Sequence, residues 1–137
     1  MNLRLLDALG NVADALIAEL DAEACAISRV IGDVLILVAE RVPEGVTLQQ
    51  GQGYLVSDYP QTAEVLATGE PRSLTLDDAD LDEAEAVILR EYGFGALLML
   101  RLELGGATWG LVEVYRVARQ PFTSGEIRRA AELLILG

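Results

Sequence analysis

The residues best suited to chemistry lie in two consecutive apolar segments, 96–104 and 107–117. Both segments alternate in the manner of β-strands, with Arg101 in the first and Glu113 in the second. If the strands pair so that these two residues share a face, they form a charge pair at the rim of a cavity. Such a pair could orient a polar ligand, because a guanidinium forks onto carboxylates and phosphates. The alternative is a structural ion pair, or an arginine that reaches solvent.

The pairing of the two strands depends on the turn between them. A two-residue turn at 105–106 places Leu98 opposite Glu113, whereas a turn one residue longer places Met99 there. A slip of one residue moves every side chain to the other face of the sheet. We expect the three-residue turn, since only that register puts Arg101 on the face of Glu113. The same face would hold the larger residues of the second strand, namely Trp109, Leu111, Glu113 and Tyr115, and the helix-covered face would hold Gly110, Val112 and Val114.

An earlier hairpin adds one more candidate. Segments 24–30 and 34–40 are separated by Ile31-Gly32-Asp33, which is typical of hairpin turns. Alternation places Ser28 on one face of its strand with Ala26 and Val30, and puts Cys25 and Ile27 on the other face. We interpret the cysteine as an inert small hydrophobe, because a buried apolar thiol is rarely reactive.

A helix predicted over residues 3–20 carries two apolar stripes. The first holds Leu5, Leu9, Val12 and Leu16, and the second holds Leu6, Ala13, Ile17 and Leu20. One stripe would cover the domain's own sheet, and the other needs a partner. We expect that partner to be a second copy of the chain; burial on two sides within one domain is the alternative.

Further elements follow from local signals. We predict helices at 60–68, 82–92 and 124–136, a strand at 72–76 and a loop at 43–53. Asp82 is a suitable N-cap with Glu85 three residues later, and Thr123 with Glu126 has the spacing of a capping box.

Composition limits the possible functions. The 137 residues predict one domain over 1–137, and the net charge of −12 argues against nucleic acid and against anionic membranes. No apolar run approaches the ~20 residues of a membrane span. A single cysteine excludes an internal disulfide and a cysteine-cluster metal site, and it fits a reducing cytoplasm. We expect no metal site.

The order of elements and two motifs resemble the GAF domain family. Ser57-Asp58-Tyr59-Pro60 is similar to the Ser-Asp-Ile-Pro element of phytochrome GAF domains, and Trp109-Gly110-Leu111 is similar to the Trp-Gly-Leu of their last strand. The resemblance implies an α+β fold. An antiparallel sheet would carry the terminal helices on one face and a ligand pocket with short helices on the other. Arg101 departs from the pattern, because proline often stands there.

The resemblance also implies which residues cover the pocket. Tyr54, Asp58, Tyr59 and Thr62 belong to the loop and helix start that roof the pocket in GAF domains. Ser57 and Asp58 could instead satisfy free N–H groups at the start of the helix beginning at Pro60. The predicted ligand-binding residues are therefore Ser28, Tyr54, Asp58, Tyr59, Thr62, Met99, Arg101, Glu113 and Tyr115.

Several GAF chemistries do not fit this chain. It has no histidine, which excludes histidine-ligated haem. Covalent bilin attachment in GAF domains uses a cysteine, usually with histidines nearby, and Cys25 lies in the first strand instead. The free methionine sulfoxide reductases resemble the domain in outline but depend on several cysteines. No nucleophile–base pair can be assembled from the residues present.

We therefore expect a non-catalytic sensory or regulatory domain, within a signal-transduction protein. It would bind an unidentified small molecule and signal through its terminal helices. The readout would be a parallel homodimer through Leu5, Leu9, Val12 and Leu16, with Ile127 and Leu134. The alternative is a ligand-free dimerisation module, in which Tyr54, Met99, Trp109 and Tyr115 pack together without a void. A small enzyme of the reductase type is the third possibility.

Overall fold

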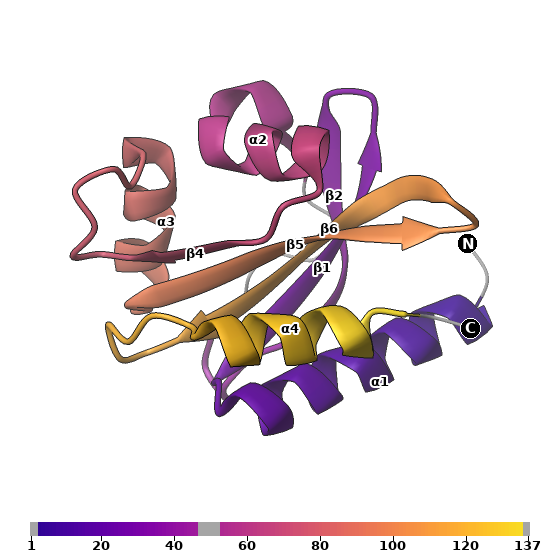
Figure 1. The fold of residues 1–137 in the computed structure, drawn as a ribbon, viewed down its shortest axis with the longest axis horizontal. Helices are drawn as coiled ribbons and strands as arrows, with labels where there is room; N and C mark the ends of the chain where they lie inside the picture. The colour runs from indigo at the N-terminus through magenta and orange to yellow at the C-terminus, as the bar shows by residue number, and fades with distance from the viewer. Residues whose placement is uncertain (1–2, 47–52, 136–137) are drawn as a thin grey trace.

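A computed structural model describes residues 3–46 and 53–135 of the chain. Six strands form one antiparallel sheet in the order β3-β2-β1-β6-β5-β4 (Figure 1). Their bounds are Ala24–Ile31 (β1), Val34–Arg41 (β2), Gly53–Leu55 (β3), Arg72–Thr75 (β4), Ala96–Leu104 (β5) and Ala107–Arg116 (β6). The short strand β3 was not predicted; it pairs with the start of β2.

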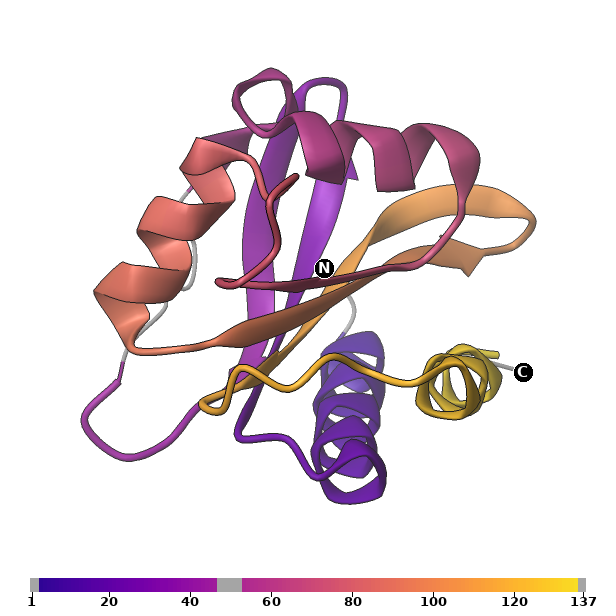
Figure 2. The same ribbon diagram turned by 60° about the vertical axis from the view of Figure 1, so that its left-hand side comes forward.

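Helices cover both faces of this sheet. They are α1 (Leu3–Leu20), α2 (Pro60–Thr68), α3 (Glu83–Tyr92) and α4 (Ser124–Leu133), with a 3₁₀ turn η1 (Val56–Asp58) before α2. The terminal helices α1 and α4 lie side by side on one face, and α2 and α3 lie on the opposite face (Figures 1 and 2). This confirms the predicted α+β arrangement. In the described part of the chain, no helix is both long enough and apolar enough to cross a bilayer.

Local capping signals set most helix ends correctly. The Asp82 carboxylate accepts a hydrogen bond from the Glu85 N–H and so caps α3. Thr123 and Glu126 form the predicted capping box at the start of α4. The last helix is shorter than expected: α4 ends at 133, and residue 136 lies outside the described residues.

Each face of the sheet carries its own apolar core, as strand alternation requires. Cys25 and Ile27 of β1 and Val112 and Val114 of β6 pack toward α1 and α4. The opposite face holds Ala24, Ala26, Leu97, Met99, Leu111 and Tyr115. The predicted facing of β1, and of β6 from residue 111 onward, is confirmed.

The register of β5 against β6 is the predicted one, but it is produced differently. Met99 lies opposite Glu113. The turn contains only Gly105 and Gly106, whose φ angles of 61° and 79° suit a two-residue hairpin. A register shift then accommodates one extra residue of β6 beside Trp109, as a β-bulge does. The predicted three-residue turn is therefore wrong, and the bulge supplies the missing residue.

The bulge also decides on which face Trp109 lies. Its ring packs against the core under the terminal helices, and the Arg29 Cζ atom lies 4.9 Å from the ring centroid. The expected place beside Glu113 is wrong, because the extra residue reverses the alternation at this point. The next residue, Gly110, lies where β6 passes very close to β1. A Cβ there would overlap the carbonyl oxygen of Ser28, which explains the glycine.

Helix α1 does not divide its apolar residues between the sheet and a second copy as predicted. Leu9 and Leu16 of the first stripe and Ala13 and Leu20 of the second are all 0% exposed. All four fill the space between α1, the sheet and α4. Burying a leucine in this way stabilises a fold by roughly 1.5–3 kcal/mol. The expectation that Leu9 and Leu16 face a second copy is therefore wrong.

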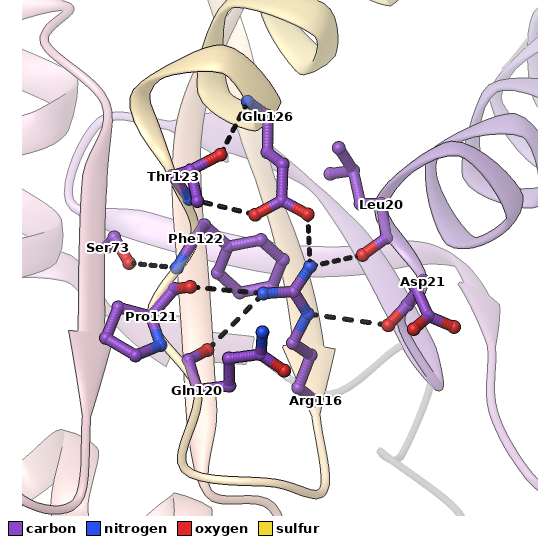
Figure 3. Close-up of polar contacts among 9 residues, drawn as sticks. All are labelled: Leu20, Asp21, Ser73, Arg116, Gln120, Pro121, Phe122, Thr123 and Glu126. Atoms are coloured by element: carbon purple, nitrogen blue, oxygen red, sulfur yellow. Dashed lines mark hydrogen bonds and ion pairs between the residues drawn. The ribbon is translucent and has the colours of Figure 1, made fainter.

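The last residue of β6, Arg116, joins the sheet to both terminal helices (Figure 3). Its guanidinium donates to the carbonyl oxygens of Leu20 and Asp21 at the end of α1. It also pairs with Glu126 in the first turn of α4, with Nη2 and Oε2 2.5 Å apart. Arg116 is only 4% exposed, so these acceptors replace the water that its charge loses.

The same arginine also holds the segment that leads into α4. Nη1 donates to the carbonyl oxygens of Gln120 and Pro121, at 3.4 and 3.2 Å. Its Cζ atom lies 4.0 Å from the ring centroid of Phe122, which is a cation–π contact. Although burial raises the pKa of Glu126, hydrogen bonds from Thr123 and Arg116 lower it below its usual range. The carboxylate of Glu126 therefore stays charged where α1, β6 and α4 meet. We call this group of contacts the Arg116 clamp.

Candidate ligand pocket

A cavity of about 60 Å³ lies between the sheet and the helices α2 and α3. A single water needs roughly 10–15 Å³ by this measure, so the cavity has room for a few waters or a small ligand. Strands β1, β2 and β6 form its floor, and β3, Tyr59 before α2, α2 itself and α3 supply its walls. The lining residues are Ala26, Ser28, Leu35, Leu37, Tyr54, Tyr59, Thr62, Glu85, Ile88, Tyr92, Leu111, Glu113 and Tyr115.

Glu113 is the carboxylate on the floor of the cavity. Its position on β6 follows from alternation, with Leu111 and Tyr115 on the same face. The Tyr115 hydroxyl donates to Oε2 at 3.1 Å. Burial and the nearby charge of Glu85 raise the pKa of Glu113 to about 8, against the smaller opposing effect of the tyrosine hydrogen bond. The side chain remains partly accessible because it faces the cavity, although protein surrounds it.

A second carboxylate, Glu85, faces the cavity from α3. Thr62 in the first turn of α2 donates its hydroxyl to Oε1 at 2.7 Å, and the same hydroxyl oxygen lies 3.4 Å from the sulfur of Met99. Glu85 is only 2% exposed. Burial raises its pKa to about 7, the Thr62 hydrogen bond opposes this rise, and the charge of Asp82 adds to it.

Four of the eight polar residues that line the cavity are tyrosines. Tyr54 and Tyr59 meet edge to face, with ring centroids 6.3 Å apart. Tyr115 stacks on Phe94 with centroids 4.8 Å apart, which holds its hydroxyl toward Glu113. Burial, followed by the neighbouring Tyr92, raises the pKa of Tyr54 to about 12. Burial also raises the pKa of Tyr59 and of Tyr115, so the phenols of Tyr54, Tyr59 and Tyr115 are neutral donors at physiological pH.

The cavity brings together six of the nine predicted site residues: Ser28, Tyr54, Tyr59, Thr62, Glu113 and Tyr115. Met99 does not line it; its sulfur lies behind Thr62, fully buried. The packing required by the ligand-free alternative is not observed. Tyr54 and Tyr115 border open volume, and Trp109 lies on the other face of the sheet.

Arg101 and Glu113 do not share a rim, so this expectation is corrected. Arg101 does leave the sheet on the side of α2, but its Nη1 donates to the Leu66 carbonyl oxygen at 3.1 Å. Its Nη2 pairs with Glu103 at 2.5 Å. The guanidinium therefore lies under the carboxyl end of α2, beyond the cavity. The structural ion pair, which was the alternative, describes it.

Asp58 is exposed and lies outside the lining, and neither of its expected roles is seen. The N-cap of α2 is Tyr59, without a side-chain capping bond. Instead, the Asp82 carboxylate accepts from the backbone N–H of Gln61 at 3.2 Å. Ser57 donates its hydroxyl to Asp33 at 2.6 Å and so ties η1 to the β1–β2 turn.

Helix α3 contributes lining residues that were not predicted: Glu85, Ile88 and Tyr92. Their spacing of three and four places them on one helix face, a pattern that is visible in the sequence. Glu85 was instead read as a capping residue. Gln61 helps to position this helix, because its side chain bonds to the backbone at Asp80 and Asp82.

The charged residues that line the cavity are all acidic. Its lining contains two carboxylates and no arginine. Cys25 lies on the opposite face of the sheet, where burial raises the pKa of its thiol. Within residues 3–46 and 53–135, no group of three or more acidic or cysteine side chains is placed so that it could hold a metal ion.

Comparisons with known proteins agree with this architecture. The family model of the GAF domain matches residues 4–135. Among solved structures, the GAF domain of Thermosynechococcus elongatus PixJ in its blue-light absorbing form has a TM-score of 0.79. Its identity is 19%, over 94% of this chain and 79% of that one. No curated protein sequence matches significantly.

Two further solved structures show the same fold. The GAF domain of a two-component sensor histidine kinase from Bacillus halodurans has a TM-score of 0.78 and 13% identity, over 93% of this chain and 86% of that one. A phycoerythrobilin-bound GAF domain from a cyanobacterial phytochrome has a TM-score of 0.78 and 16% identity, over 97% and 84%. Since the family model covers nearly all residues, this chain belongs to the GAF domain family.

Proposed function

We propose that this chain is a non-catalytic sensory or regulatory domain that binds a small molecule in the cavity between the sheet and α2 and α3. The observation that carries the proposal is the cavity itself, in which Glu85, Glu113 and several tyrosines converge. A pocket with a few convergent polar groups and perturbed pKa values is typical of binding sites. The binding residues are Ser28, Tyr54, Tyr59, Thr62, Glu85, Tyr92, Glu113 and Tyr115.

The signal passes through β6 to the terminal helices. Tyr115 lines the cavity, and the next residue, Arg116, holds the ends of α1 and α4 from the other face. A ligand that displaces Tyr115 changes the backbone that positions the Arg116 clamp. It shifts the helices only if it binds two arrangements with different affinity.

The readout is a homodimer formed through the terminal helices. Leu9, Leu16 and Leu134 are buried in the protomer, so the dimer contact uses other residues. Leu3 and Ile135 are 75% and 80% exposed, at the amino end of α1 and just beyond α4. Both residues are at the same end of the helix pair, because α1 and α4 run antiparallel (Figure 1). Exposed apolar side chains gathered at one end of a helix pair fit a second copy of that pair.

Thermal unfolding in the presence of metabolite fractions tests binding. We expect a fraction that contains the ligand to raise the Tm of the wild-type protein. Ala26→Leu, which fills the cavity from β1, should remove this shift. Ala18→Leu makes the same change at an exposed position of α1 and should keep it. If the fraction raises the Tm of both variants equally, the ligand binds outside the cavity and the proposal is contradicted.

A further inference from the structure

The two cavity carboxylates each keep one oxygen without a protein donor. Glu113 receives the Tyr115 hydroxyl on Oε2, and Glu85 receives the Thr62 hydroxyl on Oε1. No other group in the described part of the chain donates to either side chain. The second oxygens, Oε1 of Glu113 and Oε2 of Glu85, are therefore free acceptors in a cavity that both residues line.

Buried carboxylates need a compensating partner. A charged group in a dry site is stable only if it is paired, or if it becomes neutral by binding a proton. No arginine lines the cavity, and the chain has no histidine. The charge of Glu85 also adds to the rise of the pKa of Glu113, and the charge of Asp82 adds to that of Glu85. Bound protons satisfy this demand when no cation is present, and a positively charged ligand can take their place.

From this arrangement, and resting on the proposed function, we propose that the cavity binds a small organic ammonium ion. Its N–H groups donate to Glu113 Oε1 and Glu85 Oε2, and such charge-assisted bonds are stronger than neutral ones. Tyr54, Tyr59, Tyr92 and Tyr115 surround the site with aromatic rings, whose negative faces attract organic cations.

The size of the cavity and the acceptor groups in its lining favour an organic ammonium ion over other ligands. A cavity of about 60 Å³ admits a compact alkylammonium group. Calcium takes roughly 6–8 oxygen ligands, and the cavity offers two carboxylates and neutral phenols. An anion would meet two acids and no cation.

Three probes of similar size and different charge test the inference: ethylammonium, ethanol and acetate. We expect ethylammonium at millimolar concentration, at constant ionic strength, to give saturable NMR shifts at the amides of Glu85, Glu113 and Tyr115. Ethanol and acetate should give none. Glu113→Gln and Glu85→Gln should each weaken ethylammonium binding by about tenfold or more. Glu103→Gln removes an acid that pairs with Arg101 outside the cavity, and should leave binding unchanged.

The other outcomes separate this inference from the proposed function. Saturable binding of acetate or ethanol at the same amides would overturn the cation class and leave a small-molecule site in place. A parallel titration with Mg²⁺ tests for a metal ion: saturable shifts at those amides would overturn the ammonium inference and assign a metal site. If no probe binds but Ala26→Leu still abolishes stabilisation by a metabolite fraction, only the ammonium inference fails. If no metabolite fraction stabilises the wild-type protein either, both the ammonium inference and the proposed function fail.

Discussion

Tyr115 and Arg116 are consecutive residues of β6, and their side chains leave the sheet on opposite faces. Tyr115 donates its hydroxyl to Glu113 at the cavity, whereas Arg116 holds the carbonyl oxygens at the end of α1 and the carboxylate of Glu126 in α4. One peptide unit therefore separates the candidate ligand site from the helices that carry the proposed signal. The alternation of a strand creates this connection without any further element.

Loss of the Arg116 clamp should destabilise the domain strongly. We expect Arg116→Ala to lower the free energy of unfolding by about 3–5 kcal/mol, because it removes a buried guanidinium and leaves the carbonyl oxygens that it holds, together with Glu126, without that donor. Arg119→Ala is the control, since Arg119 and Asp77 form an exposed ion pair worth roughly 0–1 kcal/mol. Urea denaturation measures both. Similar losses in the two variants would show that the clamp adds no stability beyond a surface pair.

Two glycine substitutions should have opposite effects. Gly110→Ala forces a Cβ onto the carbonyl oxygen of Ser28, so β6 and β1 must separate. We expect a loss of about 3 kcal/mol or more, within the range of severe core changes. Gly125→Ala lies in α4, where its Cβ meets only Thr123 Oγ1 at 3.9 Å. It should gain up to about 1 kcal/mol from helix propensity. A tolerated Gly110→Ala would contradict the strand approach described above.

Stability should fall as pH rises through the pKa values of the cavity acids. The pKa is about 8 for Glu113 and about 7 for Glu85, whereas both groups titrate near ~4.3 in an unfolded chain. Between these values the folded state holds more protons, so the slope of unfolding free energy against pH is negative. The stabilisation is complete below the unfolded pKa and is lost as pH rises to about 8.

Urea denaturation across this pH range checks the prediction. Glu113→Gln removes one titrating group and should flatten the decline between roughly pH 5 and 8. Glu83→Gln, at an exposed position of the same helix as Glu85, should leave the decline unchanged. Parallel curves for the wild type and Glu113→Gln would show that Glu113 is not the group whose pKa is raised.

Thr62 should hold the pKa of Glu85 down. Its hydroxyl donates to the Glu85 carboxylate at 2.7 Å and so favours the charged form. Thr62→Val keeps the shape and removes the donor, and we expect the pKa of Glu85 to rise further above about 7. An NMR titration of the glutamate side chains measures this. Thr68→Val, which removes a hydroxyl bonded to the Glu64 carbonyl oxygen, is the control. An unchanged Glu85 titration in Thr62→Val would contradict the assigned donor.

The sequence predicts elements well where the signal is local. The caps at Asp82 and Thr123 placed the starts of α3 and α4, because capping depends on residues three positions apart. Alternation placed Ser28, Glu113 and Tyr115 on the cavity face. The Met99–Glu113 register was also predicted, although its cause was a bulge that no local signal marked.

Features that depend on three-dimensional packing were missed. The two stripes of α1 gave no sign that Leu9 and Leu16 lie in the core, since α4 covers part of the same helix. Arg101 has the charge of a ligand-binding residue, but its Nη1 and Nη2 atoms are held by the nearby end of α2 and by Glu103. Glu85 fits the pattern of a helix start, and that local signal does not reveal that its side chain also lines the cavity.

Native mass spectrometry of the purified protein, repeated under denaturing conditions, tests the central claim most directly. We predict that the wild-type protein carries a small mass that is lost on denaturation, or gains one with metabolite fractions. Ala26→Leu should carry none, while Ala18→Leu should retain it. The same spectra report whether the chain is a dimer. A mass that persists in folded Ala26→Leu, or no bound mass under any condition, would contradict a ligand site in the cavity.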